Sequence, residues 1–126
     1  MSKSVVYSDQ APEPIGPYSQ AIQAGNMLFI SGQIAIERSS GNIISSDIES
    51  ETRQVMVNLE KILKAAGFDF SNVVKSSIFL KDMNNFPKVN AIYGEYFKIN
   101  PPARETVEVS RLPKDVNVEI SCIAVK

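Results

Sequence analysis

The chain has 126 residues, a formal net charge of −1, no histidine and a single cysteine. This length corresponds to one domain, residues 1–126, and the charge argues against a nucleic-acid-binding protein, which usually carries a basic surplus. A zinc site is improbable because the ligands that zinc prefers are nearly absent, and a lone cysteine cannot form an intrachain disulfide.

The first ten residues are polar, and they contain no apolar stretch of the kind that a secretory signal requires. No apolar run elsewhere approaches the ~20 residues that cross a bilayer. We therefore expect a cytoplasmic protein that does not associate with membranes.

The first part of the chain predicts strands and a loop. Residues 5–7 are extended, and the proline-rich residues 11–17 are expected to form a loop rather than a helix or a central strand. Residues 20–24 and 27–36 predict a hairpin around Gly25-Asn26. Alternation in its second strand places one set of residues on an apolar face and a second set on a mixed face. The apolar set is Leu28, Ile30, Gly32, Ile34 and Ile36, and the mixed set is Phe29, Ser31 and Gln33.

The rest of the chain alternates between helices and strands. Apolar residues at three-four spacing predict a helix over 48–66, with Asp47 as N-cap and Gly67 following its end. Residues 73–80 alternate as a strand. A second helix is expected over 86–98, capped by Asn84 or Asn85 and closed by two prolines, and it is followed by strands at 103–109 and 117–125.

This order of elements predicts an α+β, two-layer sandwich, with two helices on one face of a mixed sheet. The opposite face is expected to be structured and partly apolar, so that it could pack against other subunits. We expect the following residues on it: Phe29, Ser31, Gln33, Arg104, Thr106, Glu119 and Ser121.

Two charged residues in the last strands are candidates for chemistry. Arg104, at the start of a strand, can present a planar fork to a ligand carboxylate; alternatively, it forms a structural ion pair with Glu108, Glu119 or a neighbouring chain. Glu119 can act as a general base toward water; alternatively, it is a charged residue on an exposed strand face.

Three polar residues elsewhere have weaker signals. Tyr18 follows a proline in a rigid turn and can close over a pocket, although such a tyrosine more often only packs against its surroundings. Ser31 lies within a strand and cannot be a triad nucleophile without a histidine. Asn90 either holds a loop by hydrogen bonding or is a residue of a helix boundary.

Several ordered motifs together resemble the RidA (YjgF-like) family, and the similarity covers nearly the whole chain. These motifs are residues 16–20 (GPYSQ), 29–33 (FISGQ), 89–93 (VNAIY), 102–104 (PAR), 107–109 (VEV), 112–115 (LPKD) and 118–120 (VEI). The resemblance implies a chorismate-mutase-like fold and a homotrimer with three clefts between subunits. It also implies hydrolysis of 2-imino acids, such as 2-iminobutanoate and 2-iminopropanoate, or of their enamine tautomers, to 2-oxo acids and ammonia. No metal or organic cofactor is implied.

Carried over by residue, the resemblance implies that Arg104 binds the substrate carboxylate and that Glu119 positions the attacking water. Tyr18 would form a wall of the cleft, with Ser31 and Asn90 near it or at the subunit boundary. Backbone groups around residues 104–106, which include Thr106, would hold the imine nitrogen and the water. The chain departs from many relatives at Glu105, where they carry a small residue, at Thr106, where some have cysteine, and in a short segment before Arg104.

Two other readings compete with the function that the resemblance implies. One is a non-catalytic trimeric binder or sensor of small carboxylates or oxo acids, which Glu105 in particular allows. The other is a nucleic-acid or chaperone-like role; near-neutral charge and the absence of an aromatic-basic cluster argue against RNA binding.

Overall fold

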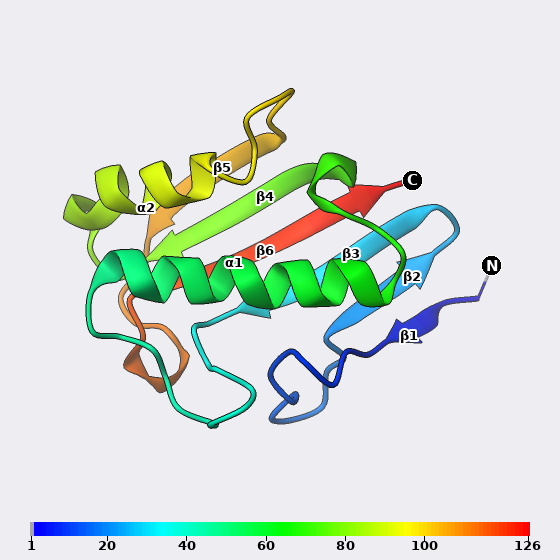
Figure 1. Ribbon diagram of the computed structural model, residues 1–126, viewed down its shortest axis with the longest axis horizontal. Helices are drawn as coiled ribbons and strands as arrows, with labels where there is room; N and C mark the ends of the chain where they lie inside the picture. The colour runs from blue at the N-terminus through cyan, green and yellow to red at the C-terminus, as the bar shows by residue number, and fades with distance from the viewer. Residues whose placement is uncertain (1) are drawn as a thin grey trace.

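The computed structural model describes residues 2–126 as one six-stranded sheet with both helices on the same face (Figure 1). The helices are α1 (Ile48–Ala65) and α2 (Phe86–Gly94). The strands are β1 (Ser4–Val6), β2 (Ala21–Ala24), β3 (Met27–Gln33), β4 (Val73–Leu80), β5 (Ala103–Glu108) and β6 (Val118–Val125). The strand order is β1-β2-β3-β6-β4-β5.

The sheet is mixed, because β4 and β5 pair in parallel while every other neighbouring pair is antiparallel. The parallel pair requires a crossover, which α2 supplies. The predicted α+β sandwich with two helices on one face of a mixed sheet is thus confirmed. No helix within residues 2–126 combines the length and the apolar character needed to span a membrane.

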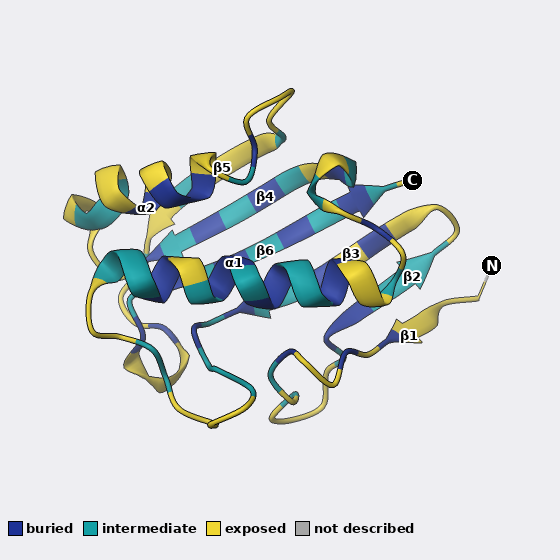
Figure 2. Cartoon of the chain, in the orientation of Figure 1, coloured by how far each residue is buried: buried dark blue, intermediate teal, exposed yellow. Residues whose placement is uncertain are grey.

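Helix α1 begins and ends as its sequence predicts. The side chain of Asp47 accepts a hydrogen bond of 2.7 Å from the backbone N–H of Ser50, and Gly67 adopts a φ of 78°, which only glycine takes up without strain. The predicted apolar stripe faces the sheet and is buried there (Figure 2). It includes Val55, Met56, Leu59, Ile62 and Leu63.

Helix α2 is shorter than predicted. It ends at Gly94 rather than at residue 98, because the backbone N–H groups of Glu95, Tyr96 and Phe97 turn to carbonyls three residues earlier. Such bonds tighten the last turn out of α geometry. Asn85 is at the N-cap position but its side chain makes no capping bond.

A β-bulge in β3 overturns part of the predicted face assignment. Ile30 pairs with Cys122 and Gln33 pairs with Ile120, so β3 has one more residue than β6 between these pairs. The extra residue reverses the alternation, and Gln33 is buried on the helix-covered side. Ile34 and Ile36, which we predicted on the covered face, now lie on the open face, and β3 ends at Gln33 instead of residue 36.

Strand β5 has the opposite face assignment from the predicted one. Arg104 pairs with Ser76 and Thr106 pairs with Ile78, and both partners on β4 are buried beneath the helices. Arg104 and Thr106 therefore share the helix-covered side and not the open face. The alternation within the strand is correct, since Glu105 points away from Arg104. The other open-face residues, Phe29, Ser31, Glu119 and Ser121, lie on that face as predicted.

Candidate active site

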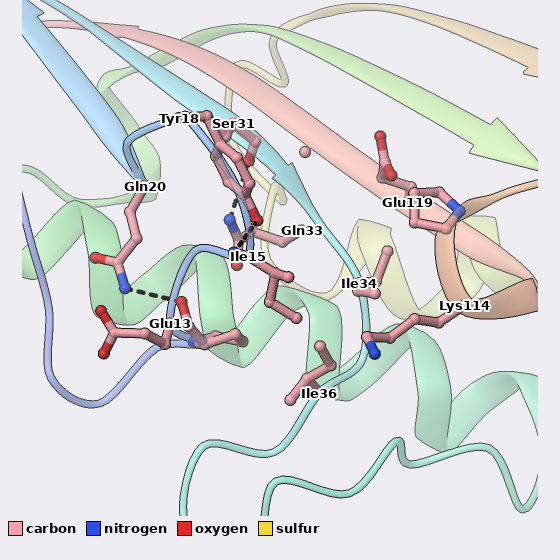
Figure 3. Close-up of a pocket in the computed structure, with 13 residues that line it drawn as sticks. Glu13, Ile15, Tyr18, Gln20, Ser31, Gln33, Ile34, Ile36, Lys114 and Glu119 are labelled. Carbon is pink, nitrogen blue, oxygen red and sulfur yellow. Dashed lines mark hydrogen bonds between the residues drawn. The ribbon is translucent and has the colours of Figure 1, made fainter.

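A cavity of about 550 Å³ opens on the sheet face that the helices leave uncovered (Figure 3). It brings together three of the predicted site residues, Tyr18, Ser31 and Glu119, from the proline-rich loop, β3 and β6. Its other lining residues are Pro12, Glu13, Ile15, Gln20, Gly32, Gln33, Ile34, Ile36, Pro113 and Lys114.

Glu119 is half-buried in this cavity, and burial raises the pKa of its carboxyl group above the ordinary value. No hydrogen bond or ion pair within residues 2–126 involves this carboxylate, whereas most acidic groups with a lowered pKa here, such as Glu95 and Asp115, have a basic partner. A carboxylate with a raised pKa and free oxygens can accept a proton from water and return it.

Gly32 provides the space that the Glu119 side chain occupies. A Cβ atom on Gly32 would lie 2.7 Å from Cδ and 3.0 Å from Cγ of Glu119, and closer still to Oε2. These separations are shorter than van der Waals contact. Any side chain at position 32 would therefore move the carboxylate.

We expect Gly32→Ala to displace Glu119 and to lower any activity that depends on its carboxylate by at least tenfold. Gly94→Ala is the matched control, because a Cβ on Gly94 has no atom within 4 Å. Catalytic rate and a crystal structure of each variant are the readouts. Full activity in Gly32→Ala, with Glu119 in its original place, would show that the position of the Glu119 carboxylate does not depend on glycine at position 32.

The proline-rich loop is held by Gln20, which sequence reasoning did not identify. Its buried side chain donates from Nε2 to the carbonyls of Ser8 and Pro12, both at 3.0 Å, and accepts at Oε1 from Ser8 N–H at 2.6 Å. Arg38 adds a 2.7 Å bond to the Ala11 carbonyl. The proline-rich loop before Tyr18 is thus held in place by hydrogen bonds from both Gln20 and Arg38.

Replacing Gln20 with Leu is expected to lower the free energy of unfolding by about 2–4 kcal/mol, because several buried backbone groups lose their partners. Gln23→Leu is the control, since Gln23 lies three residues further along, in β2, and makes one weak bond of 3.3 Å to Gly25. Urea unfolding of both variants at one protein concentration makes the comparison. Equal stabilities would refute the anchoring role.

Tyr18 and Ser31 are fixed next to each other at the wall of the cavity. The Ser31 hydroxyl donates to the Ser19 carbonyl at 2.6 Å, and Ser31 N–H donates to the Gln20 carbonyl at 2.9 Å. The Tyr18 side chain is 51% exposed, and its hydroxyl receives only a long bond of 3.4 Å from Ile15 N–H. The tyrosine can therefore contact a ligand in the cavity without losing a strong internal bond.

Arg104 lies at a second location, against helix α2. Its guanidinium carbon is 5.3 Å from the ring centroid of Phe86 and 5.1 Å from that of Tyr93, and Nη1 donates to Asn90 Oδ1 at 2.8 Å. Stacking on aromatic rings orients the guanidinium plane. The predicted ion pairs with Glu108 or Glu119 do not form among residues 2–126, and Arg104 remains exposed.

Thr106 follows on the same side of β5. Its hydroxyl oxygen is enclosed and has no hydrogen-bond partner within residues 2–126, so a ligand at this strand would meet backbone groups rather than that hydroxyl. β5 is an edge strand that pairs only with β4. Its outer N–H and C=O groups are therefore available to a ligand or to another chain.

The two groups of predicted site residues do not meet within one chain. Glu119 pairs with Phe79, which pairs with Val107, three residues from Arg104. Two strand spacings and three residue steps place the Cα atoms of Arg104 and Glu119 roughly 14 Å apart. Their side chains also point to opposite faces of the sheet. One chain thus has a cavity with a carboxylate at one place and a guanidinium with Asn90 at another.

Glu51 is a further buried residue that the sequence pattern missed. From the first turn of α1 its carboxylate accepts from the backbone N–H groups of Asn117, at 2.8 Å, and Val118, at 3.2 Å, and from Asn117 Nδ2 at 2.8 Å. This fixes the start of β6 immediately before Glu119. No sequence motif identifies Glu51; the one available signal is its place on the buried side of the predicted helix.

Cys122 and Glu105 do not take part in either group of site residues. Burial raises the pKa of the Cys122 thiol to about 11, so it is mainly protonated and unreactive at neutral pH. The Glu105 carboxylate pairs with Lys75 at 2.9 Å and accepts from the Ser77 hydroxyl, all on the open face. It therefore lies away from Arg104 and is neutralised by a lysine.

Comparisons with known proteins agree over nearly the whole chain. The family described as endoribonuclease L-PSP matches residues 8–126. A RutC family protein of Pyrococcus horikoshii is 56% identical over 124 residues, which is 98% of either chain. The human 2-iminobutanoate/2-iminopropanoate deaminase is 45% identical over 124 residues, 98% of this chain and 90% of the human one. The crystal structure of E. coli TdcF with bound serine has a TM-score of 0.94 at 36% identity and covers 98% of each chain.

Proposed function

Since the chain belongs to the endoribonuclease L-PSP (YjgF/RidA) family, we propose that it hydrolyses 2-imino acids, including 2-iminobutanoate and 2-iminopropanoate, to 2-oxo acids and ammonia. The family assignment confirms the resemblance in the sequence motifs. The observation that carries the proposal is the free, half-buried Glu119 carboxylate with a raised pKa, in a cavity that also contains Ser31 and Tyr18. The relative named as an imine deaminase and the relative holding serine support a small amino-acid-like substrate.

The complete site forms between subunits in this proposal. Glu119, Ser31 and Tyr18 of one chain would face Arg104, Asn90 and the outer edge of β5 of a neighbour. The separation of the two groups within a single chain supports this arrangement, because a substrate of this size cannot span it. The exposed apolar side chains of the open face, such as Phe29 at 41% exposure, support a homotrimer in which these faces are covered.

Substrate binding begins with the carboxylate. The guanidinium of Arg104 is held by Phe86, Tyr93 and Asn90, so its remaining N–H groups can bind a carboxylate without first losing rotamer freedom. The substrate's C2 atom, one bond from the carboxylate carbon, is then carried to the Glu119 side of the cleft. Backbone groups at the free edge of β5 near Thr106 hold the imine nitrogen.

The reaction consumes one water and needs one group to move protons. Glu119 accepts a proton as the water oxygen attacks C2 of the protonated imine, which gives a neutral carbinolamine. The protonated Glu119 then donates its proton to the nitrogen, the C–N bond breaks, and the hydroxyl proton passes to the departing ammonia as the C=O bond forms. The products are a 2-oxo acid and an ammonium ion, with Glu119 again ionised.

RNA binding is disfavoured despite the family description, because the net charge is −1 and the Lys75 ammonium is already paired with Glu105. The binder of small carboxylates stays the second candidate. It uses Arg104 in the same way but does not require Glu119 to transfer a proton. The two functions therefore differ in turnover and not in binding.

A coupled assay separates these functions. A threonine or serine dehydratase produces the imine, semicarbazide traps what survives, and release of the 2-oxo acid is followed with and without this protein. Faster release supports the deaminase. No acceleration by a folded protein that binds 2-oxobutanoate would refute the deaminase for these substrates and favour the binder.

A further inference from the structure

An apolar wall lies opposite Glu119 in the cavity. It is formed by Ile15 of the proline-rich loop and by Ile34 and Ile36, which follow β3 (Figure 3). We call these three residues the isoleucine wall. Ile15 is 67% exposed, so its apolar side chain is accessible to a ligand in the cavity.

The β3 bulge creates this wall. Without the extra residue at Ser31–Gly32, Ile34 and Ile36 would point into the protein core, as simple alternation predicts. Asn58 of α1 fixes the altered course of the chain, because its buried Nδ2 donates to the carbonyls of Ile34, at 2.9 Å, and Ile36, at 3.0 Å. The same bulge places Gly32 against Glu119. The carboxylate and the apolar wall are thus products of one local feature.

The cavity is larger than the smallest substrates need. Its volume of about 550 Å³ falls in the range of sites that enclose whole drug-sized ligands, whereas a methyl or ethyl group would touch only part of the wall. Besides Glu119, the charged residues of its lining are Glu13 and Lys114, which have opposite signs, and Glu13 is already paired with Arg38 at 3.1 Å. Away from Glu119, the cavity therefore has no strong preference for a charged group.

We propose that the isoleucine wall binds the side chain of the substrate and that the protein is most efficient toward 2-imino acids with longer aliphatic side chains. The inference rests on the proposed function, because Glu119 then defines where C2 lies. The carboxylate goes to Arg104 and the imine nitrogen to the β5 edge, so the side chain is the group left to enter this cavity. The reaction remains the addition of one water with release of ammonia.

A series of imines tests the proposal. An L-amino-acid oxidase generates them from L-alanine, L-2-aminobutyrate, L-norvaline and L-norleucine, and semicarbazide competes for each one. We expect kcat/KM to rise about fourfold for each added methylene, as burial of that group predicts. A flat or falling series, with all imines hydrolysed, would overturn the inference and leave the proposed function standing. Acceleration of none of them would overturn both.

Variants assign the preference to the wall. Ile34→Ser and Ile36→Ser should lower the ratio of norleucine-derived to alanine-derived kcat/KM at least fivefold, whereas Val74→Ser, an exposed residue of β4 outside the cavity, should leave every rate unchanged. An unchanged ratio in the Ile34 and Ile36 variants would refute the assignment. If these variants do not fold, Ile15→Ser in the exposed loop makes the same comparison.

Discussion

Replacing Glu119 with Gln is expected to lower kcat for imine hydrolysis by about 10²- to 10⁴-fold, the range that loss of a general base produces. The amide keeps the size and the hydrogen-bonding reach of the carboxylate but cannot accept the proton of water. Substrate binding should change little, because the carboxylate of the substrate is bound by Arg104. The coupled dehydratase assay, with KM and kcat determined separately, measures this effect.

The pH dependence of the wild-type protein gives an independent check. Burial raises the pKa of Glu119, so the active, ionised form is lost as the pH falls through a value above the usual ~4.3 of glutamate. We expect kcat/KM of the wild type to fall on the acidic side with a midpoint above pH ~4.3. This fall should be absent in Glu119→Gln, whose amide does not titrate. Because folding raises the pKa of Glu119, protonation of this carboxyl group adds to the free energy of unfolding at low pH, and that contribution is lost as the pH rises through the folded-state pKa. The Gln variant should therefore be no less stable than wild type at pH 7.

Glu60→Gln on the α1 surface is the matched control for this substitution and should retain full activity. Glu119→Gln with wild-type kcat and an unchanged acidic limb would show that another group transfers the proton.

Arg104→Ala is expected to lower kcat/KM by about 10- to 100-fold, the equivalent of one charge-assisted hydrogen-bond contact with the substrate carboxylate. Most of the loss should appear in KM, because the guanidinium binds a part of the substrate that does not react. Arg104→Lys should restore only part of the affinity, since an ammonium group lacks the planar fork.

Arg53→Ala is the control for the arginine, because Arg53 is exposed on α1 and pairs with Glu95. Light scattering after size exclusion verifies that both variants keep the oligomeric state of the wild type. Unaltered KM and kcat in a correctly assembled Arg104→Ala variant would show that the guanidinium does not bind the substrate.

The sequence predicted the two-layer fold because its strongest signals are local. The stripe of α1, with Asp47 and Gly67 at its ends, and the alternation in β4 define their elements without reference to the rest of the chain. Both predicted helices exist, although the end of α2 depends on turns that its apolar spacing does not reveal.

The faces of two strands were not predictable in the same way. In β5 the more apolar set, which includes Val107, lies on the open face, so the usual rule that apolar residues face the helices selects the wrong side for Arg104. In β3 the isolated glycine Gly32 is the one local mark of the bulge that turns Ile34 and Ile36 outward, and simple alternation does not take it into account. Gln20, Glu51 and Asn58 act through backbone groups far along the chain, and such bonds leave no motif.

Recovery of activity in mixed oligomers tests the central claim, that Arg104 and Glu119 act together across a subunit boundary. Arg104→Ala and Glu119→Gln chains are mixed in equal amounts, unfolded and reassembled. Half of the clefts then contain an intact Arg104, and half of those receive an intact Glu119 from the neighbour, so about a quarter of wild-type activity should return in a random homotrimer. Activity no higher than the mean of the two separate variants would contradict a shared site.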